Sequence, residues 1–248
     1  MSADTLSHEQ ARFFRSQGYF RLPEVFSKEE TSALRELVLR EAKREQDQEN
    51  QQSIGNTTLK LYGLYQRDPA LMDGVVKHPK LVGALSSLLG PNVIFVTNRH
   101  NHATVNDIQG EPAEGLHRDI LQPTRGLLTA AVYLQPSNIE NGATRIVPGS
   151  HDLPYVGVPQ ENGGGTWMSQ HAEYDGLEEQ ALSVPMPEGG VLLFNGLAFH
   201  GVGANTSGGS RISMTLGFRA ADELDFKPDN DRQILVTGEH IYRGNDQT

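Results

Sequence analysis

The chain contains no cysteine. This absence excludes disulfide bonds, cysteine-ligated zinc sites and thiol catalysis, so a bound metal has to be held by histidine and carboxylate side chains. Basic residues are also in the minority, because 21 Lys and Arg stand against 31 Asp and Glu, a formal net charge of −10. Nucleic acids and anionic membrane surfaces both favour Lys and Arg, and we therefore expect neither as a partner.

Long apolar segments are missing as well. No run approaches the roughly 18 residues that a membrane span needs. The first four residues, Met1 to Asp4, provide neither a basic start nor an apolar h-region. We therefore expect a cytoplasmic protein. Its 248 residues, 37% of them hydrophobic, can build a single core, and we expect 1–248 to form one domain whose oligomeric state is left open.

The N-terminal third is predicted to be helical. The segments Ser7–Gln10 and Ser27–Glu30 fit the capping-box pattern that opens a helix, and each precedes apolar residues at helical spacing. A third helix is expected over Pro79–Leu89, with Gly90 and Pro91 as its stop signal. The polar run 43–53 is predicted to become a loop after about residue 45.

After Pro91 the pattern changes to short β-rich segments separated by Gly- and Asn-rich turns. The segment 211–218 alternates strictly between polar and apolar residues. The other predicted strands are 93–105, 127–134 and 191–194. Strands at this spacing indicate a mainly β fold with flanking helices, an antiparallel double-sheet jelly roll with its barrel core over about 91–220. The Gly-rich stretch at about 157–176 is predicted to be an insertion or lid.

Three residues form a candidate metal centre. His117 and Asp119 point the same way if they lie on a strand, although an isolated pair of this kind is often only a surface hydrogen-bonding pair. His200 follows an apolar segment and adds a second imidazole. Two imidazoles and one carboxylate on one face select Fe(II) in oxygenases, and zinc also binds such a set. The three residues therefore indicate a metal without naming a reaction.

Arg211 and Ser213 share the polar face of the alternating strand. This face lies either in solvent or inside the barrel. A guanidinium fork beside a hydroxyl suits a carboxylate, and an Arg-x-Ser pair inside the barrel is what the distal carboxylate of 2-oxoglutarate requires. The pair therefore favours an oxygenase that uses 2-oxoglutarate.

The order of these motifs resembles the phytanoyl-CoA dioxygenase family, which includes ectoine hydroxylase and many antibiotic-pathway oxygenases. The matching motifs are His117-x-Asp119, the segment NGATRIVPGSH at 141–151, His200 and Arg211, within a resemblance that covers about 88–218. The resemblance implies a double-stranded β-helix of the cupin-like kind. It also implies Fe(II) on His117, Asp119 and His200, 2-oxoglutarate anchored by Arg211 and Ser213, and O2 as co-substrate.

The resemblance to ectoine hydroxylase extends to the strand at 93–105. It implies that Thr97, Arg99 and Asn101 look into the barrel, with Thr97 and Asn101 as contacts of 2-oxoglutarate. Arg99 is expected to meet 2-oxoglutarate or the substrate, and the alternative is that this face is only structural. His100 and His102 lie on the opposite face and are assigned structural roles.

Two further residues are less directly connected to the motifs. His151, in a Pro-Gly-Ser-His turn, is expected to order its loop. Trp167, the single tryptophan, lies in the predicted insertion and is a candidate substrate contact, with ordinary packing as the alternative.

The motifs together predict an enzyme that oxidises a small-molecule metabolite by hydroxylation, in a tailoring step of secondary-metabolite biosynthesis. Desaturation, epimerisation and ring closure stay open. Halogenation is disfavoured because related halogenases have a small residue in place of Asp119, and CoA thioesters are disfavoured because no basic patch is evident for their phosphates. Two other classes remain: a metal-binding jelly-roll module without oxygenase activity, and a cupin-type metalloenzyme that does not use 2-oxoglutarate. Neither explains Arg211 and Ser213.

Overall fold

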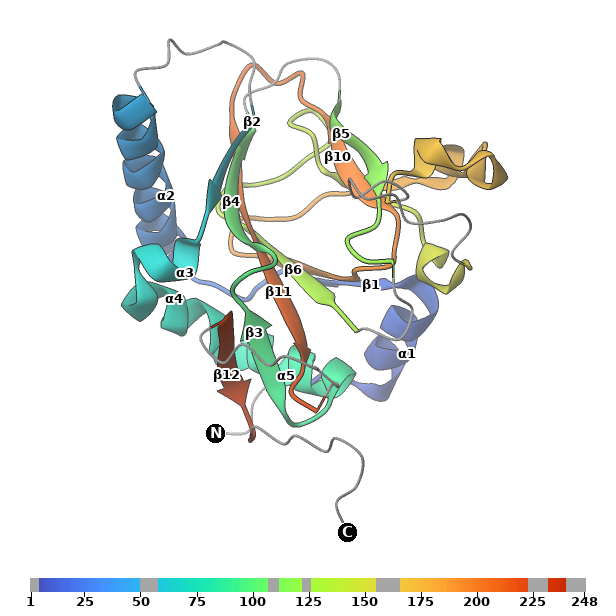
Figure 1. The fold of residues 1–248 in the computed structure, drawn as a ribbon, viewed down its shortest axis with the longest axis horizontal. Coiled ribbons are helices and arrows are strands. Elements are labelled where there is room, and N and C mark those ends of the chain that lie inside the picture. Colours follow the sequence, from blue (N-terminus) through green and yellow to red (C-terminus); the bar gives the residue numbers. More distant parts are fainter. Residues whose placement is uncertain are drawn as a thin grey trace.

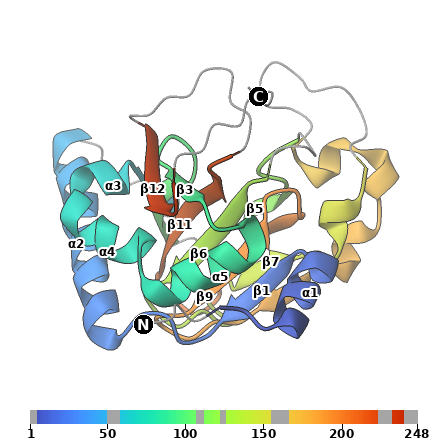
Figure 2. The same ribbon diagram turned by 90° about the horizontal axis from the view of Figure 1, so that it is seen from below.

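Two antiparallel sheets face each other in the computed structural model, and helices surround the larger one (Figures 1 and 2). The structure describes residues 5–49, 58–106, 112–121, 126–154, 166–222 and 232–239. This arrangement confirms the predicted mainly β jelly roll with flanking helices.

The larger sheet is built around one long C-terminal strand. Its strands are β1 (Tyr19–Leu22), β2 (Thr58–Tyr62), β3 (Val93–Val96), β4 (Asn101–Asn106), β6 (Leu128–Tyr133), β9 (Val191–Asn195), β11 (Arg211–Ala220) and β12 (Gln233–Thr237). The hydrogen-bonded order is β1-β9-β6-β11-β3-β12, with β4 pairing both β11 and β2. Strand β11 therefore contacts β6 along one edge, and β4 and β3 along the other.

The smaller sheet brings together residues that are far apart in the sequence. Its strands are β5 (Pro112–His117), β7 (Thr144–Ile146), β8 (Leu182–Val184) and β10 (His200–Ala204), in the order β5-β10-β7-β8. His117, at the end of β5, is the Cα partner of His200, at the start of β10, and the register shifts between His200 and Val202. The pairing of β5 with β10 therefore places the two histidines side by side.

The helices of the described residues are α1 (His8–Gln17), α2 (Lys28–Glu49), α3 (Leu64–Arg67), α4 (Pro69–Val76) and α5 (Pro79–Leu89), with short 3-10 turns η1 (Ser150–Asp152), η2 (Met168–Gln170), η3 (Ala172–Tyr174) and η4 (Leu177–Gln180). Helices α1, α2 and α5 begin where the sequence predicts them. Contrary to the prediction, the N-terminal third is not helical throughout, because β1 and β2 pair with β9 and β4 of the larger sheet. Both capping boxes form: Ser7 closes on Gln10, and Ser27 Oγ accepts from the Glu30 N–H at 3.2 Å while the Glu30 carboxylate accepts from the Ser27 N–H at 2.7 Å.

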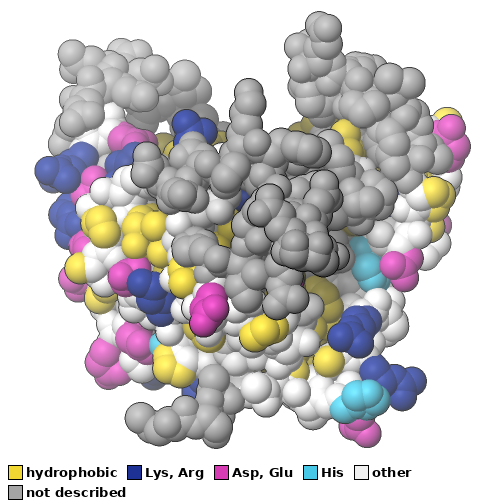
Figure 3. All heavy atoms as spheres, turned by 60° about the horizontal axis from the view of Figure 1, so that its bottom comes forward, with side chains coloured by type: hydrophobic (Ala, Val, Ile, Leu, Met, Phe, Trp, Pro, Cys, Tyr) yellow, Lys and Arg dark blue, Asp and Glu magenta, His cyan; other side chains and the backbone are white. Residues whose placement is uncertain are grey.

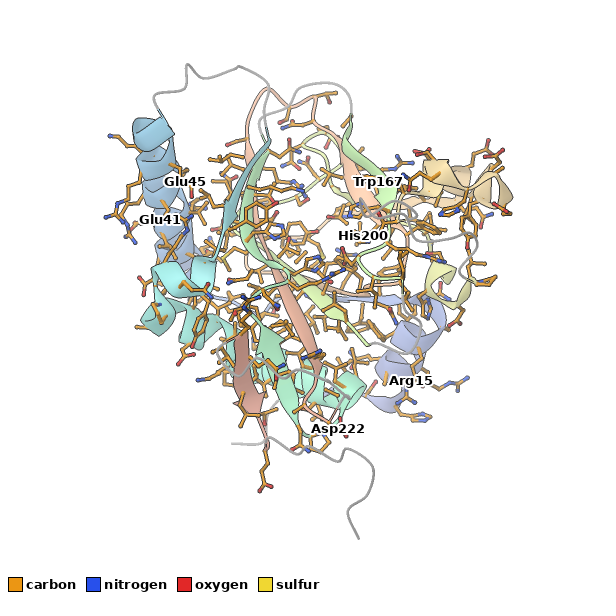
Figure 4. The ribbon with its side chains drawn as sticks, in the orientation of Figure 1. Arg15, Glu41, Glu45, Trp167, His200 and Asp222 are labelled. Carbon is orange, nitrogen blue, oxygen red and sulfur yellow. The ribbon has the colours of Figure 1, made fainter. Side chains whose placement is uncertain are left out.

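One helix boundary differs from the prediction. Helix α2 continues to Glu49 instead of ending near Glu45. The segment is rich in Glu, Gln, Lys and Arg, which all favour a helix, and Arg67 of α3 bonds the Glu45 carboxylate from the neighbouring element. Glu41, which projects from the same helix (Figure 4), accepts hydrogen bonds from three arginines, and these bonds outweigh burial to hold its pKa below the usual range.

The main hydrophobic core lies between the larger sheet and the helices. Helix α5 packs against β3, β11 and β12 (Figure 2). Strand β11 directs its apolar side chains into this core, each at most 2% exposed: Ile212, Met214, Leu216 and Phe218. The intervening residues of β11 therefore face the smaller sheet.

Basic and acidic side chains lie intermixed on the described part of the face in Figure 3, a pattern typical of a solvated surface. In the described ranges, none of the helices has both the length and the hydropathy required to cross a bilayer.

The insertion predicted at about 157–176 is described only in part, because residues 157–165 lie outside the described residues. The remainder forms η2 and η3, and η2 lies beside β5.

Candidate metal centre

The His-x-Asp motif lies where β5 leaves the smaller sheet. The Asp119 N–H donates to the Gly196 carbonyl at 2.7 Å, which fixes the backbone directly after the strand. Arg118 points away from both neighbours: its guanidinium lies 4.3 Å from the centroid of the Phe199 ring and donates to the Ser150 carbonyl at 3.0 Å. Because Arg118 points to one side of the backbone, His117 and Asp119 both point to the other, as expected for residues i and i+2.

His117, Asp119 and His200 converge on one point. One ligand atom from each lies within 4.8 Å of the others, and no other such group of three occurs in the part of the chain that the structure describes. The Asp119 Oδ1 is 3.9 Å from His117 Nε2 and 3.5 Å from His200 Nε2. The Nδ1 atoms face backbone carbonyls instead, of Gly115 at 3.2 Å and Ala198 at 2.9 Å. A carbonyl partner keeps the hydrogen on Nδ1 and leaves a lone pair on Nε2 for a metal.

The electrostatics suit a cation in the middle. Burial alone would raise the pKa of Asp119, but the neighbouring His200, His100 and His117 and a hydrogen bond from His100 outweigh it and hold that pKa below its usual value. Burial lowers the pKa of His200 to about 4 despite the attraction of Asp119. At neutral pH the carboxylate is therefore ionised and the His200 imidazole is neutral, which are the forms that bind metals.

A second layer of contacts surrounds the Asp119 carboxylate. Thr129 Oγ1, near the start of β6, donates to Asp119 Oδ2 at 2.9 Å. His100 Nε2 lies 3.1 Å from Asp119 Oδ1, and its Nδ1 lies 3.0 Å from Thr129 Oγ1. The Arg99 guanidinium also donates to the Asp119 carbonyl oxygen. Asp119 is thus held through its carboxylate and through its backbone.

A cavity of about 130 Å³ opens between the two sheets and includes the three candidate ligands. Its other lining residues are Lys60, His100, His102, Thr104, Asn106, Ala131, Thr144, Phe194, Gly201, Val202, Arg211, Ser213 and Thr215. Most of the lining residues carry polar side chains, and strands β2, β4 and β11 of the larger sheet supply Lys60, His102, Thr104, Asn106, Arg211, Ser213 and Thr215. The candidate metal ligands therefore come from the smaller sheet and from the residues just after β5. The larger sheet supplies polar side chains that could bind a ligand.

Arg211 is the strongest indication of a ligand. Its side chain lines the cavity and the residue is only 2% exposed. Burial lowers its pKa, with a small opposing contribution from Tyr133, and an arginine stays charged even so. Its Nε has no hydrogen-bond partner within the described residues. A buried guanidinium with an unsatisfied donor fits an anion in the cavity, and Ser213, two residues along the same strand face, adds a hydroxyl.

The expected positions of Thr97, Arg99 and Asn101 have to be corrected, because none of the three lines the cavity. The predicted strand 93–105 is broken by a turn at 97–100 into β3 and β4. Asn101 fastens this turn to α3: its amide donates to the Thr97 carbonyl at 3.0 Å, and its Oδ1 accepts from the Tyr65 N–H at 3.0 Å. Arg99 holds the Asp119 backbone instead of projecting into the cavity.

The opposite face of β4 lines the cavity. His102, Thr104 and Asn106 are on it, whereas Ala103 and Val105 lie in the core. His100 joins them from the turn, so the two histidines that the sequence assigned to structural roles lie in the site. The sequence of β4 could have predicted this. Its apolar residues Ala103 and Val105 alternate with His102, Thr104 and Asn106, so that Asn101 shares the core face and His102 the opposite one. Lys60 reaches the site through the pairing of β2 with β4, which no local pattern indicates.

Trp167 and His151 have different surroundings. Trp167 lies beside the metal centre (Figure 4), with its ring centroid 4.8 Å from that of His117. His151 Nε2 lies 2.9 Å from the Arg15 carbonyl at the end of α1. Gly18 leaves room for that imidazole, because a Cβ there would lie 2.5 Å from its Nδ1. His151 therefore ties its turn to α1.

The family model of phytanoyl-CoA dioxygenase (PhyH) matches residues 14–213 of the chain. This match confirms the resemblance that the motifs indicate. Among curated proteins, a dioxygenase of Penicillium canescens, OlcK, is 28% identical over 175 residues, which are 66% of this chain and 52% of that protein. The ectoine dioxygenase of Bordetella parapertussis is 24% identical over 89% of this chain and 77% of its own. The chain spans about half the length of the first curated relatives it matches.

Solved structures show the same fold. The non-haem α-ketoglutarate-dependent carbocyclase SnoK from nogalamycin biosynthesis has a TM-score of 0.64 at 20% identity, covering 96% of this chain and 99% of its own. EctD from S. alaskensis with bound Fe has a TM-score of 0.66 at 21% identity, covering 92% of this chain and 82% of its own. At such identities the likeness supports the fold of the two sheets.

Proposed function

Because the chain belongs to the phytanoyl-CoA dioxygenase family, we propose that it is an Fe(II)- and 2-oxoglutarate-dependent dioxygenase acting on a small organic molecule. The observation that carries this proposal is the pairing of two features across one cavity. His117, Asp119 and His200 present their ligand atoms within 4.8 Å of one another, and the buried Arg211 lines the same cavity with an Nε that has no hydrogen-bond partner among the described residues.

Each residue of the proposed site has a separate role in binding iron or 2-oxoglutarate. His117 and His200 offer Nε2 lone pairs and Asp119 a negative charge, a set that suits Fe(II). Arg211 binds the distal carboxylate of 2-oxoglutarate and Ser213 donates a hydroxyl hydrogen to it. The Phe194 ring lies against His200, with 4.3 Å between ring centroids, and covers one side of that imidazole. Iron, when bound, supplies the redox chemistry by which O2 converts 2-oxoglutarate to succinate and CO2 while the substrate is oxidised.

Hydroxylation of a secondary metabolite is the reaction that we favour. Two structural relatives, the carbocyclase SnoK and the epimerase SnoN, come from nogalamycin biosynthesis. Ring closure and epimerisation therefore stay among the products to be sought. Trp167, whose ring is packed against His117 at a tilt of 46°, is our candidate for the residue that bounds the substrate beside the metal.

A metal-binding jelly roll without oxygenase activity is the competing function, together with a metalloenzyme that does not use 2-oxoglutarate. Both account for the triad. Neither accounts for a charged side chain that is 2% exposed, faces the cavity and lacks a partner for its Nε in the described residues, because burying an unpaired charge is costly.

The decisive experiment is an anaerobic titration of the iron-loaded protein with 2-oxoglutarate, monitored by visible absorption. We expect the weak charge-transfer band of an Fe(II)–oxo-acid chelate. Admission of O2 should then release succinate and CO2, and a chelator should abolish both signals. If iron binds without producing the band, the oxygenase proposal fails and the metal-binding jelly roll becomes the better account.

A further inference from the structure

His100 has an unusual backbone conformation. Its φ is +33°, and among the residues described it is the single non-glycine residue with positive φ. Such a conformation is strained for a residue with a Cβ, although His, Asn and Asp tolerate it better than most. Strain of this kind persists where the surroundings enforce it, often at functional sites.

The surroundings of His100 do enforce it. The Gly217 N–H of β11 donates to the His100 carbonyl at 2.8 Å. A Cβ on Gly217 would lie 3.2 Å from the His100 Cβ and 3.3 Å from the Leu127 side chain. Glycine at 217 therefore gives the turn room to approach β11, which brings the His100 ring over the Asp119 carboxylate.

The ring closes a triangle of contacts. His100 Nε2 reaches Asp119 Oδ1 at 3.1 Å, His100 Nδ1 reaches Thr129 Oγ1 at 3.0 Å, and Thr129 Oγ1 donates to Asp119 Oδ2 at 2.9 Å. A carboxylate only accepts hydrogen bonds, so the His100 Nε2 carries a hydrogen in this arrangement. Both carboxylate oxygens are thereby fixed, and the carboxylate plane with them.

The two oxygens are not equivalent. Oδ1 is the atom that faces His117 Nε2 at 3.9 Å and His200 Nε2 at 3.5 Å. Its second lone pair stays available beside the bond from His100. Oδ2 is engaged by Thr129, which is 0% exposed and lies near the start of β6. The carboxylate is thus held with one oxygen directed at the metal site.

We propose that His100 and Thr129 form a clamp that makes Asp119 a one-oxygen ligand and keeps the other oxygen away from the metal. The inference rests on the proposed metal centre and extends it to two positioning residues. A carboxylate that binds through one oxygen leaves more of the metal's positions open, and an oxo acid and O2 both need such positions. The clamp thereby keeps the site open for chemistry.

The test is the binding of Co(II), as a coloured stand-in for Fe(II), to the metal-free full-length protein under anaerobic conditions. Thr129→Val preserves shape but removes the hydroxyl. His100→Asn tolerates positive φ but is too short to bridge both partners. We expect each change to raise the Co(II) Kd about 10–100-fold, the usual effect of losing an outer-shell partner. The visible Co(II) bands should also weaken, because a freed carboxylate can bind through both oxygens and raise the coordination number.

Two controls separate positioning from general stability. Thr129→Ser restores the hydroxyl and should return the Kd to within about threefold of wild type. Thr31→Val removes a comparable bond at a remote position, since the 0% exposed Thr31 donates to the Glu188 carboxylate at 2.8 Å. It should lower the melting temperature but leave the Co(II) Kd within about twofold of wild type.

The clamp is overturned if Thr129→Val and His100→Asn both bind Co(II) within about twofold of wild type, or if Thr31→Val weakens binding as much as they do. Because Co(II) binding needs no 2-oxoglutarate, the two proposals fail separately. The expected Co(II) pattern without 2-oxoglutarate consumption supports the clamp and overturns the proposed function. Consumption by wild type, with Co(II) binding unchanged in both variants, overturns the clamp alone.

Discussion

The two faces of strand β11 differ sharply although they belong to the same ten residues. One face, from Ile212 to Phe218, lies in the main core, which α5 helps to cover. The other carries Arg211, Ser213 and Thr215 and lines the cavity. The first face packs in the apolar core, whereas Arg211 on the second is buried with an Nε that no other described residue satisfies. Stability and chemistry are therefore assigned to opposite sides of one sheet.

This separation has a practical meaning. Substitutions on the helix-covered face should change the free energy of unfolding and leave ligand binding nearly unchanged. Substitutions on the cavity side should do the reverse, since removing a functional group there does not open a hole in the core. The four predictions below test the separation, beginning with the largest expected effect.

His117→Ala should reduce turnover by at least about a thousandfold, because loss of one member of a catalytic set removes most of its effect. The His117 side chain is 19% exposed, so the metal-free variant should melt close to wild type. Succinate production and a thermal melt measure the two quantities. A variant that keeps most of its turnover would mean that the metal lies elsewhere.

Leu216→Ala tests the other face. Leu216 is 0% exposed in the main core, and such truncations cost about 2–5 kcal/mol in unfolding free energy. For a chain of this size that lowers the melting temperature by roughly 5–15 °C. The Co(II) Kd of the folded variant should stay near the wild-type value. A large change in metal affinity would show that the two faces are energetically coupled.

Arg211→Ala should raise the KM for 2-oxoglutarate about 10–100-fold, which corresponds to losing a charged hydrogen-bonded contact. Iron should stay bound, since Arg211 is not among the candidate ligands. The anaerobic chelate band should need correspondingly more 2-oxoglutarate to form. An unchanged KM would remove Arg211 from the proposed anchor.

Ser213→Ala is expected to have the smallest effect, a rise of about 3–10-fold in the same KM, because a neutral hydroxyl contributes less than a guanidinium. Loss of one oxygen from a polar wall should leave the melting temperature within a few degrees. An effect larger than that of Arg211→Ala would reverse our assignment of the main anchor.

The sequence predicted the residues that follow simple alternation. β11 keeps a period of two along its length, so its two faces could be assigned, and His117 and Asp119 are two residues apart at a strand end. Helices α1, α2 and α5 were predicted from caps and stop signals. The end of α2 was misplaced, because a polar run of Glu, Gln and Arg is as compatible with an exposed helix as with a loop. Strands β1 and β2 were missed, because their partners β9 and β4 lie far along the chain.

The missed residues depend on interactions that are not local. The turn at 97–100 resets the alternation of the expected strand, and its positive φ at His100 follows from the approach of Gly217. Thr129 lies in a mostly apolar strand, and its role is evident only from the hydrogen bond that its hydroxyl donates to Asp119. Lys60 enters through the pairing of β2 with β4. Tertiary contacts decide all of these positions.

The central place of β11 also determines when the protein can first fold during synthesis. Strands β3, β4 and β6 all hydrogen-bond to it, yet it is made after them. Until residues up to 220 have left the ribosome, each of these three strands lacks its hydrogen-bonding partner along the edge that β11 later covers, and that edge stays open to other chains. A strand made late in synthesis thus joins strands made much earlier, and we expect folding to be slow because these pairings are far apart in the sequence.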